Sequence, residues 1–379
     1  MVRLFEQSHR EGNAMRVLVL GSGAKDHAIA WWFSQSRLID GLYVAPGNVG
    51  TKTIAENLSI DPSDPEQVYE ACQTHGIDFV FVGTEAPLFT GVIDFLNERG
   101  IDTFGAPNRA LKLEGDRNFA RMFSDRHNIP TSSHVLFDDE EKLSEYLKRH
   151  EGERFVVKSN AIAPSRIMVD STDYSTLMDF SKGLLATGPI ILEEHLNGLP
   201  ITITLFLDNK GYLMLPTSSD YMKVEEGGLP TGGMGSICPV PLQKELSEAL
   251  VESIIEPVLF GLKAEKMAYK GVLTISVIIT KNGPILVDYH VRFNDPATQA
   301  FVPLINTDIV DILDAMKHDT LSSLKLEVSN QSAVALVVAS EGYPGKPIIG
   351  KILEPMPAPL LFNSFEGAPR YFFGGVQEY

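Results

Sequence analysis

Residues 16–34, RVLVLGSGAKDHAIAWWFS, carry the pattern that decides the fold. A short run typical of a buried strand, Arg16 followed by four apolar residues, leads directly into the turn Gly21-Ser22-Gly23, and an apolar stretch typical of a helix follows from His27 to Ser34. This order of strand, glycine-rich turn and helix opens many nucleotide-binding α/β units. The turn lacks the third glycine of the dinucleotide fingerprint, so taken alone it is slightly better explained as a tight strand-to-helix connection.

Further strands of the same type follow in the N-terminal third of the chain. Apolar runs at residues 41–45, 78–82 and 101–105 alternate with segments that can form helices. Strands that alternate with helices predict a parallel, doubly wound sheet over residues 15 to about 115.

The rest of the chain predicts helices and antiparallel strands. We expect helices at 111–127 and 174–185, and strands at 155–158, 189–194, 201–217, 271–291 and 333–340. The stretch 271–291 contains the turn Lys281-Asn282-Gly283, which is a strong hairpin signal. The predicted fold class is therefore α/β, with a parallel sheet followed by antiparallel sheets.

Composition limits the possible functions. The chain has 379 residues, of which 44% are hydrophobic, and its formal net charge is −17, so we expect two to four domains and no affinity for nucleic acid. The two cysteines, Cys72 and Cys238, favour a reducing, cytoplasmic location over a disulfide framework. No apolar run approaches the ~20 residues that span a bilayer, and residues 1–14 are interpreted as a flexible preface.

Two loops predict a phosphate-binding edge on the parallel sheet. Residues 46–51 (PGNVGT) and 83–88 (GTEAPL) each follow a predicted strand, as does the Gly21–Gly23 turn. Backbone amides and short polar side chains in such loops can hold a phosphate. Ordinary turn chemistry explains any one of these loops, but it becomes a weaker explanation with each loop at the same edge.

Two motifs in the second half of the chain also suggest chemistry. Residues 231–235 (TGGMG) contain three glycines that let the backbone approach a ligand closely, although a flexible hairpin would look the same. In the stretch 288–296 (DYHVRFNDP), alternation places Asp288, His290 and Arg292 on one face. The first two could share a divalent ion and the arginine could neutralise an anion, while a solvated sheet face is an equally good interpretation.

In order along the chain, these motifs resemble the phosphoribosylamine–glycine ligase family. The motifs are GSG, GNVGT, GTEAPL, KLEG, NIPT, VVK, ILEEHL, TGGMG, RFNDPATQ and ASEGYPG, and they run from Met15 to about Gly345. The resemblance implies an ATP-grasp fold with an N-terminal doubly wound parallel-sheet domain, a small ATP-lid subdomain, a central antiparallel-sheet domain and a short C-terminal domain. The implied bounds are 15–118, 119–194, 195–328 and 329–379.

The resemblance also implies a reaction and its small-molecule partners. The family joins glycine to 5-phosphoribosylamine in purine biosynthesis, through an acyl phosphate that is made with ATP. The implied cofactors are ATP and Mg²⁺ (or Mn²⁺), and the implied state is a monomer or homodimer that contacts no nucleic acid or membrane.

Carried over to this chain, the resemblance assigns site residues by their matching motifs. The catalytic residues would be Arg292, Asp220 and Gly235. Substrates would be bound by Gly21, Gly23, Asn48, Gly50, Thr51, Glu85, Pro87, Gly233 and Asp295. ATP would lie against Arg117, Lys158, Glu193, Glu194 and Leu196. Metal would lie at Asp288 and His290.

The nucleotide side departs from the family pattern. Asp116-Arg117 replaces Ser-Lys, and the segment 159–167 has neither the glycines nor the lysine of the family's phosphate loop. Tyr221-Met222 and Ala297 also differ from the family motifs. Two alternatives therefore stand beside the family reaction: a paralogous ATP-grasp ligase of specialised metabolism that uses another amine or acid, and a catalytically inactive homologue that binds a ligand or a partner.

Overall fold

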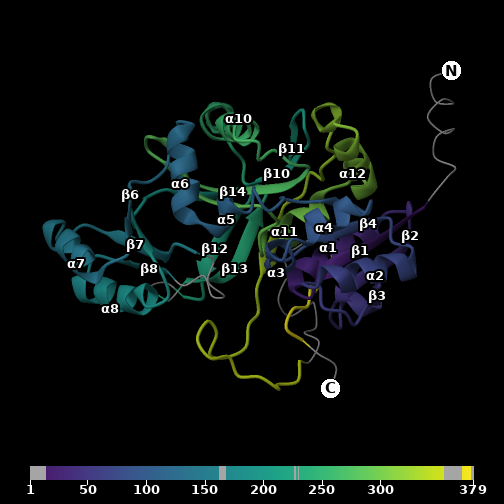
Figure 1. The fold of residues 1–379 in the computed structure, drawn as a ribbon, viewed down its shortest axis with the longest axis horizontal. Helices are drawn as coiled ribbons and strands as arrows, with labels where there is room; N and C mark the ends of the chain where they lie inside the picture. Colours follow the sequence, from purple (N-terminus) through teal and green to yellow (C-terminus); the bar gives the residue numbers. More distant parts are fainter. Residues whose placement is uncertain (1–13, 162–167, 226–227, 229, 354–368, 377–379) are drawn as a thin grey trace.

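The computed structural model describes residues 14–161, 168–225, 228, 230–353 and 369–376. Within them lie four sheets (Figure 1): an N-terminal parallel unit on one side, a small antiparallel unit on the other, and two further sheets between them. The predicted α/β layout is therefore confirmed. The expected preface, apart from Ala14, lies outside the described residues, as do positions 162–167 of the segment after the VVK strand.

The N-terminal sheet forms because its short apolar runs are buried on both faces, as parallel strands require. Val17 to Leu20 and Phe79 to Val82 are almost fully buried. All pairings are parallel, in the order β3-β2-β1-β4-β5, which confirms the doubly wound prediction. The strands are β1 (Met15–Gly21), β2 (Ile39–Pro46), β3 (Glu56–Asn57), β4 (Phe79–Val82) and β5 (Asp102–Phe104). The helices are α1 (Ala24–Ser34), α2 (Pro65–His75), α3 (Glu85–Phe89) and α4 (Val92–Glu98), with a 3-10 turn at Thr51–Thr53.

The strand order of this sheet determines where a ligand can bind. The order changes direction between β1 and β4, so the loops after these two strands flank a crevice at the carboxyl edge. The Gly21–Gly23 turn follows β1 and Glu85 follows β4, as the sequence predicts.

The small antiparallel unit has a core of its own. Its strands pair in the order β6-β9-β7-β8, and α7 and α8 pack against them through Leu143, Leu147, Leu177 and Met178. Figure 1 shows this unit at the left, away from the parallel sheet. The strands are β6 (His134–Phe137), β7 (Phe155–Ser159), β8 (Met168–Ser171) and β9 (Ile190–Glu194), and the helices are α7 (Glu140–Arg149) and α8 (Tyr174–Leu185). Strands β6 and β8 were not predicted.

The central part contains two antiparallel sheets, in the orders β11-β10-β14-β15 and β12-β13-β16. The hairpin predicted at Lys281-Asn282-Gly283 is confirmed, because β14 pairs with β15 across it. The first sheet contains β10 (Leu199–Leu207), β11 (Tyr212–Met214), β14 (Gly271–Thr280) and β15 (Gly283–His290), and the second β12 (Ser219–Lys223), β13 (Pro230–Cys238) and β16 (Ala333–Leu336).

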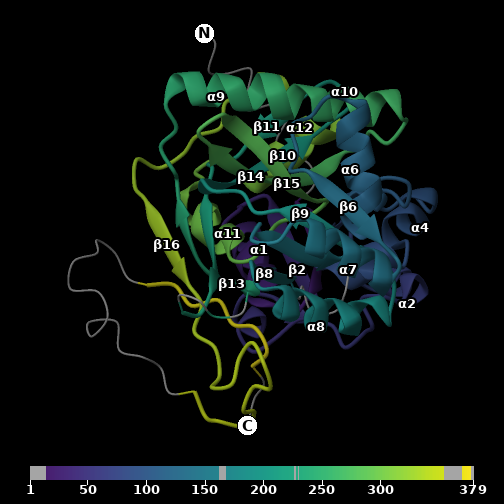
Figure 2. The same cartoon turned by 90° about the vertical axis from the view of Figure 1, so that its left-hand side faces the viewer.

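Helices cover these two sheets and connect them to the rest of the fold. A continuous helical segment, with a π-helical stretch at Val251–Ile255, covers one face (Figure 2). The helices are α5 (Lys112–Gly115), α6 (Arg117–Arg126), α9 (Lys244–Leu250), α10 (Glu256–Ala264), α11 (Ala297–Phe301) and α12 (Ile309–Lys317), with 3-10 turns at Val302–Leu304 and Leu321–Ser323. No helix in the described part of the chain combines the length and apolarity needed to cross a bilayer.

Three predicted elements and one alternative need correction. The helix expected at 111–127 is two helices, because Asp116 has extended backbone and its carboxylate caps α6 by accepting from the Phe119 N–H. The strand expected at 201–217 ends at Leu207. A turn follows, in which the Asp208 carboxylate accepts hydrogen bonds from the Lys210 and Gly211 N–H groups. The strand expected at 333–340 ends at Leu336. The glycine cluster at 231–235 lies within strand β13 and is not a flexible hairpin.

An aromatic cluster joins the N-terminal sheet to the central part. Phe293, just after β15, lies 5.7 Å between ring centroids from Phe81 and 5.6 Å from Phe206. Its ring is also 5.4 Å from that of Phe301 in α11. Phe293 is 1% exposed, so its ring fixes the position of the residues on either side of it.

Phe293→Ala should therefore destabilise the protein by about 3–5 kcal/mol, because it leaves a cavity where two layers meet. Denaturant unfolding followed by circular dichroism measures the change. The matched control is Phe260→Ala, because the Phe260 side chain is 69% exposed and should cost much less. Equal losses for the two variants would contradict this description of the core.

Candidate functional site

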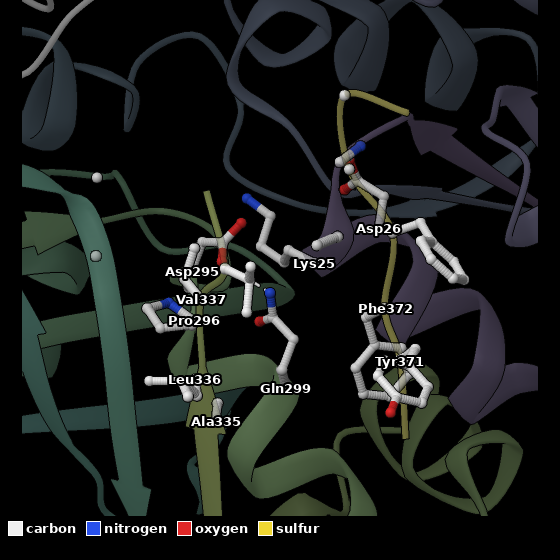
Figure 3. A pocket seen from close by; sticks show the side chains of 18 of the residues that line it. Lys25, Asp26, Asp295, Pro296, Gln299, Ala335, Leu336, Val337, Tyr371 and Phe372 are labelled. Carbon is white, nitrogen blue, oxygen red and sulfur yellow. Dashed lines mark hydrogen bonds between the residues drawn. The ribbon is translucent and has the colours of Figure 1, made fainter. Parts of the chain in front are cut away.

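A cavity of about 1880 Å³ opens at the carboxyl edge of the parallel sheet (Figure 3). One wall is made by the turn after β1 and by Glu85, and the opposite wall by residues 230–233 of β13, by β16 and by Arg292 and Asp295. Residues 369–376, near the C-terminus, complete the lining. The cavity therefore lies at the crevice where open α/β sheets bind their ligands.

Six of the predicted catalytic and substrate-binding residues line this cavity. They are Gly21, Gly23, Glu85, Gly233, Arg292 and Asp295. The other predicted residues of these two groups are absent from the lining, namely Asn48, Gly50, Thr51, Pro87, Asp220 and Gly235. The fold thus brings together residues from both ends of the chain, as the motifs predict, and leaves several of the assigned positions behind the cavity wall.

The turn after β1 is shaped by a buried carboxylate. The Asp26 Oδ2 accepts a hydrogen bond of 2.9 Å from the Gly23 N–H, and burial raises the pKa of Asp26. Gly21 has a φ of +149°, and a Cβ there would lie 2.2 Å from the Asp26 carboxylate. A side chain at position 21 would therefore break the turn, which explains the glycine.

The loop at 48–51 is held by its own hydrogen bonds. The Asn48 Oδ1 accepts from the Gly50 N–H at 2.8 Å and from the Thr51 N–H at 3.1 Å. The Asn48 amide donates to the Ser22 and Phe373 carbonyls, and Thr51 is fully buried. These polar groups therefore shape the rim of the cavity. Pro87 is buried in α3, behind Glu85.

Strand β13 presses closely against the loop that carries Asp295. Gly233 has a φ of +127°, and a Cβ there would lie 2.5 Å from the Pro296 Cδ. Gly235 pairs with Tyr221 on one side and Leu336 on the other. The glycines are thus needed for the close approach of two backbone segments at the cavity wall.

Asp220 is a half-buried acceptor on the neighbouring strand. Its carboxylate accepts from the Ser236 hydroxyl at 2.6 Å and from the Thr202 hydroxyl at 2.8 Å. Burial raises the pKa of Asp220 although these hydrogen bonds oppose the shift. The side chain therefore links β12 to β13 and β10.

Arg292 forms the ionic centre of the cavity wall. Its guanidinium is 4% exposed and forms ion pairs with Glu85 and with the Glu114 Oε1, the latter at 2.9 Å. Burial would raise the pKa of Glu85, but the charges of Arg292 and Lys25 lower it. The Arg292 Nε is buried without a hydrogen-bond partner among the described residues, which leaves one donor for a ligand.

The predicted ATP residues form a second ionic cluster. The Lys158 Nζ lies 2.9 Å from the Glu193 Oε2 and 3.2 Å from the Asp288 Oδ2. Arg121 donates to the Glu193 Oε1 at 2.7 Å, and the Arg117 Nε lies 3.7 Å from the Asp288 Oδ1. Burial would raise the pKa of Glu193, but Lys158 and Arg121 lower it.

The two other predicted ATP residues follow on the same strand. Glu194 is exposed at the end of β9, and its carboxylate accepts from the Ser133 hydroxyl. Leu196 is half-buried just beyond the strand. The five ATP positions are therefore grouped around α6, β7, β9 and the segment after β9.

The start of the segment after β7 is tied to α6. The Arg117 Nη1 donates to the Ser159 carbonyl at 2.7 Å and to the Ala161 carbonyl at 3.3 Å. The Asn160 amide donates to the Asp116 carboxylate, and its oxygen accepts from the Asn118 N–H at 2.8 Å. These contacts replace, at this end of the segment, the glycine-rich backbone that the family pattern has.

The two predicted metal residues have other partners. Among the described residues, no group of three or more His, Cys, Asp or Glu side chains could hold a metal ion. Burial would raise the pKa of Asp288, but Lys158, Arg117 and Arg121 lower it, and the His290 Nδ1 lies 3.4 Å from the Glu114 Oε1. Mg²⁺ commonly combines one or two carboxylates with substrate phosphates. Of the two predicted metal residues, only Asp288 offers the carboxylate oxygen that such an ion prefers, and it is paired with Lys158 and Arg117.

The C-terminal segment covers the rim of the cavity. The Phe373 N–H donates to the His27 Nδ1 at 3.0 Å, and its carbonyl accepts from the Asn48 amide at 2.6 Å. The Arg370 guanidinium lies 4.3 Å from the centre of the Trp31 ring. Residues more than 300 positions away from α1 in sequence therefore close this side of the site.

Four important residues were missed by sequence reasoning: Lys25, Glu114, Arg121 and Phe373. Lys25 lies just after the GSG motif and Glu114 lies within the KLEG motif, so the sequence pointed to both positions although neither was assigned a role. Arg121 follows Arg117 by one helical turn, and this spacing places both on one face of α6. Nothing in the local sequence marks Phe373, because its role depends on a long-range contact.

Comparisons with known proteins show which proteins the chain is similar to. The phosphoribosylglycinamide synthetase N domain matches residues 15–114, and the ATP-grasp (A) domain of the same synthetase matches residues 115–298. The phosphoribosylamine–glycine ligase of Caldanaerobacter subterraneus subsp. tengcongensis is 36% identical over 342 residues, which cover 88% of this chain and 82% of the relative.

Solved structures extend the likeness to the fold. The crystal structure of phosphoribosylamine–glycine ligase from Thermotoga maritima matches with a TM-score of 0.77 and 25% identity, and the match covers 96% of this chain and 88% of the other. The biotin carboxylase domain of Hydrogenobacter thermophilus 2-oxoglutarate carboxylase, solved with MgADP, ADP and bicarbonate, matches with a TM-score of 0.64 and 14% identity. That match covers 87% of this chain and 76% of the other, and shows the shared ATP-grasp fold.

Glu193→Gln should destabilise the protein by about 3–5 kcal/mol, because it leaves Arg121 and Lys158 buried without their shared carboxylate. Glu194→Gln is the matched control, since the neighbouring side chain points outward and should change the free energy of unfolding by no more than about 0.5 kcal/mol. Denaturant unfolding at pH 7 measures both variants. A Glu193 variant as stable as the control would show that the cluster does not need its carboxylate.

His27 should make the stability depend on pH. Burial lowers the pKa of His27 to about 4, and its neutral Nδ1 accepts from Phe373. Between pH 6.5 and 4 the unfolded chain binds more protons at this residue than the folded chain does, so stability is lost as the pH falls through this window.

We therefore expect the melting temperature to fall more between pH 7 and pH 5 in the wild type than in His27→Asn, which keeps an acceptor but cannot titrate. His318→Asn, at an exposed position, should keep the wild-type pH dependence. The same pH dependence in His27→Asn and in the wild type would refute the role assigned to His27.

Proposed function

The chain belongs to the phosphoribosylglycinamide synthetase family, and from this premise we propose that it is an ATP-dependent carbon–nitrogen ligase. The single observation that carries the proposal is the spacing along and just beyond β15. Asp288 lies beside the cations of the nucleotide side, and Arg292, four residues further on, lies in the cavity wall. One short stretch of chain therefore connects the place for a phosphoryl donor with the place for its acceptor.

The reaction has two steps. A carboxylate oxygen of the acid attacks the γ-phosphorus of ATP, so an acyl phosphate forms and ADP leaves. The amine nitrogen then attacks the carbonyl carbon, the bond from this carbon to the phosphate oxygen breaks, and phosphate leaves with the electron pair while the amine loses a proton. The substrates proposed from the relatives' names are glycine and 5-phosphoribosylamine.

The nucleotide side would bind ATP through its cations. Lys158 and Arg117 would contact the phosphates, and the adenine would lie against Glu193, Glu194 and Leu196. Mg²⁺ (or Mn²⁺) bound with the nucleotide would neutralise phosphate charge, with Asp288 as its ligand and His290 beside it. ATP-grasp structures such as the carboxylase domain above contain ADP and magnesium, which supports this assignment.

In the cavity, Arg292 would stabilise the negative charge that develops on the acyl phosphate, through its unpaired Nε. Asp220, Gly233, Gly235 and Asp295 would position the acid. The turn at Gly21–Gly23, the loop with Asn48, Gly50 and Thr51, and Glu85 with Pro87 would position the phosphorylated amine. The C-terminal segment would help to exclude water, which hydrolyses acyl phosphates.

The setting proposed for this ligase is cytoplasmic purine biosynthesis, with small-molecule partners and a monomeric or homodimeric state. The comparisons favour the family reaction over a paralogue or an inactive homologue, since the matched relatives are themselves named as ligases. The altered Tyr221-Met222 pair, of which Tyr221 is exposed, and Ala297 are the features that would favour another amine or acid.

ATP binding by calorimetry with Mg²⁺, followed by measurement of ADP release, tests the proposal. ADP release that requires both glycine and phosphoribosylamine is expected. If ADP release requires a different acid or amine, the proposed substrates are wrong and the ligase chemistry stands. A protein that binds no ATP would overturn the proposed function.

Arg292→Lys should lower kcat by about 10²-fold or more, because lysine keeps the charge but loses the fork of donors. The conservative change is preferred to alanine, which would leave Glu85 and Glu114 without their buried partner. Circular dichroism checks the fold, and Arg99→Lys at the surface serves as the control. Wild-type kcat in the Arg292 variant would remove this residue from the mechanism.

A further inference from the structure

Lys25 is a buried cation to which neither the family match nor the motifs give a role. It is the second residue of α1, its side chain is 5% exposed, and it lines the cavity. Figure 3 shows Lys25 and Asp295 reaching toward the same space. Among the described residues, no hydrogen bond or ion pair to the Lys25 Nζ is found, whereas the other buried cations of the site, Lys158, Arg121 and Arg292, are each paired with at least one carboxylate.

The carboxylates around Lys25 are already engaged elsewhere. Asp26 accepts from the Gly23 N–H, Glu85 pairs with Arg292, and the Asp295 Oδ1 accepts from the Gln299 Nε2 at 2.7 Å. Burial and the like charge of Arg292 lower the pKa of Lys25, while Asp26, Glu85 and Asp295 oppose the shift. A buried ammonium group in this position gains most from a negatively charged ligand.

Other polar atoms around Lys25 also lack partners. Buried atoms without a hydrogen bond among the described residues include the Asp26 Oδ1, the Arg292 Nε, the Asn294 Oδ1 and the Gln299 Oε1. Asp26, Arg292 and Gln299 all line the same cavity. Buried polar groups in proteins are usually paired, so a group of exceptions at one cavity indicates a site built for a polar ligand.

We propose that Lys25 is a substrate-binding residue that holds an oxyanion, either the carboxylate of the acid or the phosphate of the amine substrate. The substrate classes rest on the proposed ligase function, but the oxyanion site itself rests on the buried, unpaired Lys25. Arg292 is held by Glu85 and Glu114, whereas Lys25 has no such carboxylate pair, so its ammonium group is available for an incoming anion.

The effect of Lys25→Met on the stability of the ligand-free chain distinguishes a purely structural role for Lys25 from a ligand-binding role. If Lys25 offset the nearby acids in the folded protein, Lys25→Met would destabilise the ligand-free chain. If Lys25 waits for a ligand, Lys25→Met removes an uncompensated buried charge at nearly constant volume, so the ligand-free chain should be equally stable or more stable. Denaturant unfolding of the ligand-free protein measures this difference.

Calorimetry on the full chain without ATP gives the direct test. Glycine is compared with glycinamide, which lacks the carboxylate, and ribose 5-phosphate with ribose. Lys25→Met and Lys25→Gln should weaken binding of one charged ligand by roughly 10- to 100-fold, the range for a lost charge-assisted hydrogen bond. Lys25→Arg should retain most of the affinity, and Lys244→Met, at a position 82% exposed, should behave as the wild type.

The outcomes separate the two sources of the oxyanion. Weakened glycine binding alone assigns Lys25 to the acid, and weakened ribose 5-phosphate binding alone assigns it to the amine substrate. The proposal is overturned if neither affinity changes, if the wild type binds neither charged ligand, or if Lys25→Met destabilises the ligand-free chain. Lys25-dependent binding without ADP release would keep this inference and reject the ligase function. ADP release that does not change in the Lys25 variants would keep the ligase function and reject this inference.

Discussion

The pairing of buried charges is the constraint on which this architecture depends. Glu114, at the end of α5, is 7% exposed, and its carboxylate accepts from the Val291 N–H and pairs with Arg292. A carboxylate and a guanidinium are tolerated at such depth only when each finds the other, because an isolated buried charge costs several kcal/mol. The segment between the parallel sheet and the small unit is therefore held against the end of β15 by this ion pair, in addition to any apolar contacts.

The same constraint acts at the other end of the site. Lys158 on β7 and Arg121 on α6 share Glu193 of β9, and Lys158 also reaches Asp288 of β15. The small antiparallel unit is thus connected to the central sheet by ion pairs, while its apolar core is separate. A unit attached in this way can respond to a ligand that competes for the same charges, and a nucleotide phosphate is such a ligand.

The sequence predicts those parts of the fold that depend on local patterns. The apolar run at residues 17–20, which is buried on both faces of the sheet, and the Lys281-Asn282-Gly283 turn are local signals, and both are confirmed. The prediction of one helix at 111–127 was wrong, because the Asp116 carboxylate accepts a hydrogen bond from the Phe119 N–H and begins a new helix there. Helix propensity averaged over a long stretch of sequence does not reveal such a break. The glycine cluster at 231–235 was recognised, but its strand depends on partners at residues 219–223 and 333–336.

For the site, six of the residues predicted to be catalytic or substrate-binding line one cavity, yet motif spacing could not show how their charges are balanced. The nucleotide side combines three cations, Lys158, Arg121 and Arg117, with the carboxylates of Glu193 and Asp288, so positive charge is in excess there. In the cavity wall, Arg292 lies among the carboxylates of Glu85, Asp26 and Asp295, and it also pairs with Glu114, which is outside the lining. A polyphosphate is thus attracted to the first region, whereas a carboxylate or phosphate that entered the second would be repelled without a further cation. Lys25 supplies such a cation beside Asp26, Glu85 and Asp295, and it is a residue whose partner no local motif could identify.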